Sequence, residues 1–84
     1  MSSVKIVGIH VSAARDLLKL TQDDLARAAG VSRLSVFNFE NSKTVTRAST
    51  VNKIRDALER RGIEFTNGDK PGVRLDPEKA IIPR

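Results

Sequence analysis

The feature that most constrains this chain is Gly30, which is followed only two residues later by Ser32. Glycine adopts a positive φ at low steric cost, and helices commonly end on a glycine in that conformation. Serine is one of the preferred N-cap residues of a helix. A helix that ends at Gly30 and another that begins after Ser32 are therefore joined by a very tight turn, and the chain must fold around this corner.

The two helices beside this corner are expected to be short. Thr21 is the expected N-cap of the first, because its hydroxyl can accept a hydrogen bond from a backbone N–H two or three residues further on. This places one helix over about 22–29 and the next over about 33–41. In the second helix Val36 and Phe39 lie on the inner side, and the residues between them project outward.

A further helix is expected on each side of this pair. Apolar residues recur at helical spacing over about 9–19, and again in a fourth helix that runs to about Arg61 and stops at Gly62. Ser49 or Thr50 is the expected N-cap of that fourth helix.

After Gly62 the apolar residues alternate, which is typical of β-strands. Ile63 and Phe65 alternate on one side of the Asn67-Gly68 turn signal, and Val73 and Leu75 do so on the other, which predicts a β-hairpin. The chain is thus expected to be mainly α, with four to five helices and a short C-terminal hairpin. The expected parts are an N-terminal arm or strand (1–8), a helical domain (9–61), the hairpin (62–76) and a tail (77–84).

Composition narrows the classes of function. The 84 residues contain no cysteine and a single histidine, His10, so a thiolate metal site is excluded and an imidazole site is disfavoured; no metal or cofactor is expected. No Gly-rich phosphate loop or nucleophile elbow is present, so the chain is not expected to be an enzyme. No apolar run approaches the roughly 18 residues of a membrane span. The N-terminus lacks the charged segment followed by an apolar segment that is typical of a signal peptide. The bacterial cytoplasm or nucleoid is therefore the expected location.

Charge favours a polyanionic partner. The net charge is +5, and residues 41–55 contain four Lys and Arg residues and no acid. Two short helices joined by a Gly-containing turn are also the unit whose second helix enters the major groove of DNA. Together these features indicate binding to duplex DNA.

Residues 20–44, LTQDDLARAAGVSRLSVFNFENSKT, resemble the phage repressor/Cro-type (XRE) helix-turn-helix family, and the resemblance extends over roughly 9–61. It implies a lambda-repressor-like helical bundle that binds operator sites, usually as a homodimer. The implied base-contacting residues are Arg33, Leu34, Phe37 and Asn38. The implied phosphate-contacting residues are Gln22, Ser32, Ser35, Asn41, Lys43, Thr44 and Arg47. Arg15 and Glu40 match a family ion pair with a structural role.

The chain departs from the family pattern at two places. Ser42 stands where the family often has glycine, so a left-handed backbone there is expected to be mildly strained. Leu34 and Phe37 are more apolar than usual for a DNA-facing helix. They can contact thymine methyl groups, or pack on a loop or on a protein partner, and both interpretations remain open.

The expected function is sequence-specific regulation of transcription, by a repressor or autoregulator that binds a palindromic operator as a dimer. The dimer interface is expected at the end of the fourth helix, the hairpin or the N-terminal arm, although the hairpin can equally cover the core of its own chain. The alternative is an antitoxin-type or anti-activator-type module that keeps the fold and binds a protein, for which Leu34, Phe37 and the segment 80–82 are the motivation. An RNA-binding role is a lesser option, because the aromatic stacking sheet of the common RNA-binding modules is absent.

Overall fold

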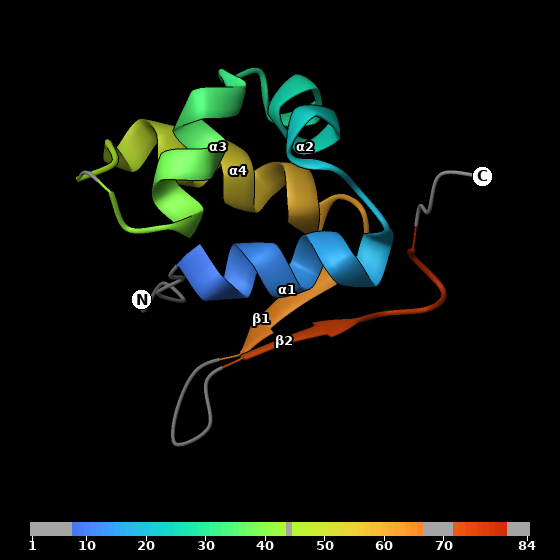
Figure 1. The fold of residues 1–84 in the computed structure, drawn as a ribbon. Helices are drawn as coiled ribbons and strands as arrows, with labels where there is room; N and C mark the ends of the chain where they lie inside the picture. Colours follow the sequence, from blue (N-terminus) through green and yellow to red (C-terminus); the bar gives the residue numbers. More distant parts are fainter. Residues whose placement is uncertain (1–7, 44, 67–71, 81–84) are drawn as a thin grey trace.

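The computed structural model describes residues 8–43, 45–66 and 72–80. It contains four helices followed by two strands, in the order α1 (Gly8–Leu18), α2 (Gln22–Ala29), α3 (Arg33–Glu40), α4 (Ala48–Glu59), β1 (Ile63–Thr66) and β2 (Gly72–Leu75) (Figure 1). The prediction of a mainly helical fold with a short C-terminal hairpin is confirmed. The expected N-terminal arm lies outside the described residues except for Gly8, which is the first residue of α1.

Local hydrogen bonds define the ends of α2 and the start of α3. The Thr21 hydroxyl accepts from the Asp24 backbone N–H at 3.0 Å, and the Asp24 carboxylate accepts from the Thr21 backbone N–H at 3.0 Å, which completes a capping box. Gly30 ends α2 with φ 71° and ψ 36°, and the Ser32 hydroxyl then caps α3 by accepting from the Ser35 N–H. The tight corner predicted at Gly30 is therefore present.

The start of α4 differs from the expectation. Arg47 is its N-cap, with extended backbone angles and no side-chain cap hydrogen bond, and the helix begins at Ala48. Ser49 and Thr50 therefore lie inside the first turn, and the prediction that one of them caps the helix is wrong. The helix starts earlier because the Arg47 carbonyl already accepts from the Val51 backbone N–H at 3.0 Å, so residues 48–50 have helical backbone angles and cannot serve as the N-cap.

The hairpin packs on its own chain. Ile63 pairs with Leu75 and Phe65 with Val73 in antiparallel register, so these four side chains share one face of the ribbon. Ile63 and Phe65 are buried, and the other two are partly buried against the same core. On the opposite face, Arg74 Nε donates to Glu64 Oε1 at 2.6 Å across the strands. Packing within the chain is thus observed, and the Asn67-Gly68 turn lies outside the described residues.

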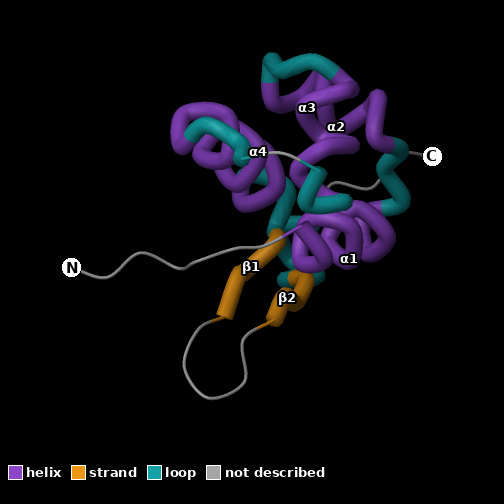
Figure 2. Tube along the Cα trace, turned by 60° about the vertical axis from the view of Figure 1, so that its left-hand side comes forward, coloured by secondary structure: helices purple, strands orange, loops and turns teal. Residues whose placement is uncertain are grey.

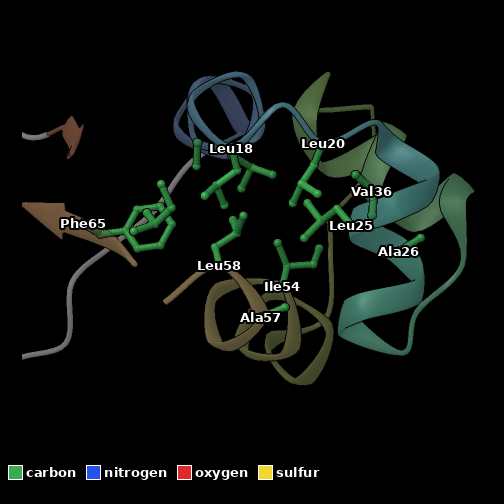
Figure 3. Close-up of a cluster of buried hydrophobic side chains, with 12 residues drawn as sticks. Leu18, Leu20, Leu25, Ala26, Val36, Ile54, Ala57, Leu58 and Phe65 are labelled. Carbon is green, nitrogen blue, oxygen red and sulfur yellow. The ribbon is translucent and has the colours of Figure 1, made fainter. Parts of the chain in front are cut away.

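One apolar core joins the helices and the hairpin (Figure 3). Leu18 of α1, Leu25 of α2, Val36 of α3 and Ile54 of α4 are each fully buried. In both Figure 1 and Figure 2, α1 lies between α3 and the hairpin, so the hairpin covers the side of the core away from α3. The face of α3 that points away from this core is consequently not covered by another described helix or strand.

Candidate nucleic-acid interface

The α2–turn–α3 unit holds α3 rigidly against the body of the domain. Leu25 and Ala26 of α2 and Val36 of α3 are buried between the helices, and the Val31 backbone N–H donates to the Ala26 carbonyl at 3.0 Å across the turn. The small side chain of Ala26 allows this close approach. The direction of α3 is therefore set by the packing of α2 and the left-handed conformation of Gly30.

The outward face of α3 carries the four residues that the resemblance implied as base contacts. Leu34 is 65% exposed and Phe37 40% exposed, whereas Val36 is fully buried on the opposite side of the helix. Arg33 is exposed in the first turn, and Asn38 is half-buried next to α4. All four can reach a ligand that lies along α3.

A hydrogen-bonded network fixes the end of α3 to α1 and α2. Glu40 Oε2 accepts from Arg15 Nε at 2.7 Å, and Glu40 Oε1 accepts from Arg15 Nη2 at 3.0 Å and from Gln22 Nε2 at 2.9 Å. Arg15 Nη1 also donates to the Leu20 carbonyl at 2.9 Å. The ion pair named from the resemblance is thus bidentate and mostly shielded from water, with the Arg15 and Glu40 side chains 15% and 5% exposed.

This network also orients Gln22, the first residue of α2. One hydrogen of its side-chain amide is directed to Glu40, and the other stays available at the N-terminal end of the helix. The backbone N–H groups of a first turn favour an anion, although that of Asp24 is already used by Thr21. Gln22 can therefore present an amide and helix donors to a phosphate while its own position is held by Glu40.

Three other polar residues of the predicted set have structural partners of their own. The hydroxyls of Ser32 and Ser35 hydrogen-bond to each other at 2.9 Å at the start of α3. Asn41 donates from Nδ2 to the Phe37 carbonyl at 2.9 Å at the end of the helix. Lys43 is exposed, and Thr44 lies outside the described residues.

A polar hollow of about 330 Å³ separates α3 from the start of α4. It brings together Ser35 and Asn38, which the sequence had indicated, with Arg47 from the acid-free stretch. Its other lining residues are Val45, Thr46 and Thr50. Thr46 and Thr50 were missed from the sequence, although their place beside Arg47 in a stretch without acids was a signal that could have identified them.

Two arginines in or beside α3 have no acidic partner among the described residues. Exposed arginines elsewhere pair with acids, as Arg27 does with Asp23 and Arg60 with Asp56. From residue 33 to 55 the chain has five Lys and Arg residues and one acid, and that acid is the buried Glu40. Arg33 and Arg47 form no ion pair with another described residue. The α3 face is therefore suited to a polyanion.

Two pKa shifts follow from the hydrogen bonds of this region. The hydrogen bonds that Arg15 donates to the Glu40 carboxylate raise the pKa of Arg15 above its ordinary value, and the nearby charges of Glu40 and Asp16 add to the rise while burial opposes it. The backbone N–H of Thr21, followed by its hydroxyl contact, lowers the pKa of Asp24. Both groups stay charged at neutral pH, which keeps the network and the capping box intact.

Within the described ranges, no group of three or more His, Cys, Asp or Glu side chains could hold a metal ion. None of the helices described is long and apolar enough to cross a membrane.

A family model described as helix-turn-helix matches residues 11–65 of the chain. This segment begins in α1 and ends in β1, so it contains the whole α2–turn–α3 unit and the Arg15–Glu40 pair. A comparison with curated proteins finds no match.

Proposed function

Because this chain belongs to the XRE-type helix-turn-helix family of DNA-binding regulators, we propose that it is a sequence-specific repressor or autoregulator that acts as a dimer on a palindromic operator. The observation that carries the proposal is the α3 face, where exposed Arg33 and the polar hollow beside Arg47 lie on a surface without free acids. Such a face combines side chains that can hydrogen-bond to base edges with cations that can contact phosphates.

In this proposal α3 lies in the major groove. Arg33 donates to the O6 and N7 atoms of a guanine, and Asn38 forms two hydrogen bonds with the N6 and N7 atoms of an adenine. Leu34 and Phe37 face the same groove. These contacts supply sequence discrimination, because the donor and acceptor pattern of the major groove differs for each base pair.

Affinity comes from the flanks of α3. Gln22, Ser32, Ser35 and Asn41 offer neutral donors to phosphate oxygens, and the cationic side chains of Lys43 and Arg47 add a salt-dependent contribution. Thr44 is proposed as a phosphate contact from the sequence alone. These contacts set the position of α3 along the duplex rather than its sequence preference.

A dimer would place two α3 helices in successive major grooves, with half-site centres about 34–36 Å apart. Occupation of a promoter then blocks polymerase, which requires no further contact and therefore favours repression. The proposed site of action is the bacterial cytoplasm or nucleoid, and no catalytic step is assigned to the chain. Sedimentation of the protein with a selected palindromic duplex is expected to show two chains per duplex, and one chain per duplex would contradict the dimer.

The test of specific binding begins with selection of preferred duplexes from a random-sequence pool. Binding of wild type, Arg33→Ala and Arg60→Ala to the selected duplex and to a scrambled one is then measured by fluorescence anisotropy. Arg33→Ala is expected to weaken specific binding by about 1–3 kcal/mol and to relax one base position. Arg60→Ala removes the same charge from a residue paired with Asp56 and is expected to leave specific binding unchanged. Equal affinity of the wild type for both duplexes would overturn the proposal.

The second candidate is an interaction module on the same fold, which the exposure of Leu34 and Phe37 favours. An antitoxin or anti-activator of this kind would use the apolar part of α3 to bind a protein. This second candidate predicts that the selection yields no preferred duplex. It also predicts that a purified protein partner binds the wild-type chain and does not bind Leu34→Asp.

A further inference from the structure

Arg33, Leu34 and Phe37 line a small hollow of about 170 Å³ on the outward face of α3. Leu34 and Phe37 stand three residues apart, so they are neighbours on the helix surface. Both are substantially exposed, whereas Val36 is fully buried and Phe39 is partly buried against the core. The hollow thus has apolar walls and one cationic side.

The chemistry of the major groove limits what an apolar wall can face there. Every base edge in that groove presents hydrogen-bond donors or acceptors. Thymine presents, in addition to its O4 acceptor, an apolar methyl group at C5. Apolar side chains set against donors and acceptors would leave those groups without partners, at a cost in free energy. Leu34 and Phe37 are therefore matched to a base pair that carries a methyl group.

Arg33 supplies the second half of the match. Its guanidinium forms no hydrogen bond with another described residue, and it borders the same hollow. A guanidinium in the major groove pairs best with the O6 and N7 atoms of guanine. A methyl group and a guanine are then contacted from one small site, so they must belong to adjacent or nearly adjacent base pairs.

We propose that Arg33, Leu34 and Phe37 form one recognition unit for a 5-methylpyrimidine beside a guanine in each half-site. This inference rests on the proposed function and states which DNA sequence class that function uses. Thymine and 5-methylcytosine carry the methyl group at the same ring position, so both satisfy the apolar part of the unit. The affinity of the protein for a cytosine-containing variant of its site therefore depends on cytosine methylation.

The occupant is DNA because the hollow lies on the helix that the family uses to enter the major groove, and because the neighbouring surface lacks exposed acids between residues 33 and 55. An apolar protein segment would need a larger surface than these two side chains offer. A protein occupant of Leu34 and Phe37 is the outcome that the following experiment would reveal instead.

The probe is the duplex selected by the wild-type protein from a random pool, with each thymine replaced in turn by deoxyuridine. This replacement removes the methyl group and leaves the hydrogen-bonding pattern unchanged. Loss of one buried methyl contact is expected to weaken binding about fourfold at one thymine of the half-site, next to the guanine that Arg33→Ala no longer recognises. At the same position, 5-methylcytosine is expected to bind about fourfold more tightly than cytosine.

Variants assign the effect to the hollow. In Leu34→Ser the difference between thymine and deoxyuridine is expected to fall below twofold, whereas Leu17→Ser is expected to keep the fourfold difference. Leu17 is the control because it is the same residue type, 41% exposed on α1, compared with 65% for Leu34 on α3. Thermal unfolding of both variants checks that the fold is retained.

If no deoxyuridine replacement changed the affinity while specific binding stayed intact, the recognition unit would be overturned and the proposed function would stand. An unchanged deoxyuridine effect in Leu34→Ser would overturn it as well, because the methyl group would then be contacted elsewhere. Failure to select any duplex would instead reject the proposed function, and loss of a purified protein partner in Leu34→Ser would assign the surface to that protein.

Discussion

The Glu40 carboxylate at the end of α3 is held by the Arg15 guanidinium of α1 through two hydrogen bonds, of 2.7 and 3.0 Å. The two residues are 25 positions apart, and their side chains are 5% and 15% exposed respectively. The pair therefore lies mostly away from water and connects α3 directly to α1, the first helix of the bundle.

Removal of one partner of this pair is expected to be costly. Glu40→Leu or Arg15→Met alone leaves a poorly solvated charge and should lower the free energy of unfolding by about 3 kcal/mol. The double variant Arg15→Met/Glu40→Leu should lose much less than the sum of the two single variants, because neither charge remains and only the hydrogen bonds to Gln22 and to the Leu20 carbonyl are lost as well. Urea unfolding of the four proteins measures this coupling. If each single variant had a free energy of unfolding within about 1 kcal/mol of wild type, roughly the value of a surface pair, the pair would be effectively solvated.

The capping box predicts a specific pH dependence. The pKa of Asp24 is lowered from its ordinary value of 3.8 because its carboxylate accepts the Thr21 backbone N–H. A lowered pKa in the folded state contributes stability that is fully present above pH 3.8 and is lost as the pH falls through the folded-state pKa. The difference in unfolding free energy between wild type and Asp24→Asn should therefore be larger at neutral pH than in strong acid. A difference that stays constant across this range would contradict the assignment.

Ser42 carries backbone strain that can be relieved. Its φ of 53° lies in the left-handed region, where a side chain with a Cβ atom costs about 1 kcal/mol or more. Ser42→Gly should raise the free energy of unfolding by about 0.5 kcal/mol, because the greater entropy of glycine in the unfolded chain offsets part of the gain. Ser42→Ala keeps the Cβ atom and should show no such increase. Thermal or urea unfolding of the two variants decides between these outcomes.

Salt dependence of DNA binding tests the proposed phosphate contacts. Lys43→Ala should weaken binding to all duplexes and reduce the slope of log affinity against log salt by about 0.9. Lys79→Ala removes the same charge from an exposed residue beyond the hairpin and should leave the slope unchanged. Equal changes in the two variants would mean that net charge alone, rather than a contact by Lys43, governs the interaction.

Features that depend on near neighbours in the chain could be predicted from residue type and spacing. The Thr21 cap, the Gly30 corner and the Ser32 cap each involve hydrogen bonds or backbone angles within three or four residues, so residue type and spacing suffice to predict them. The alternation of Ile63 and Phe65 likewise predicted the hairpin. The family resemblance identified the same α2–turn–α3 unit that the family model matches.

Contacts between residues far apart in the chain could not be predicted in this way and are known from the packing of the folded chain. Gln22 is oriented by Glu40, which is 18 residues away, and Thr50 lines a hollow with Asn38 instead of capping α4. Gly8 is the first residue of α1, in a place where a Cβ atom would overlap the carbonyl oxygens of Phe39 and Glu40. Each of these contacts depends on how whole helices pack, and helix packing is set by the summed burial of many side chains rather than by a local pattern.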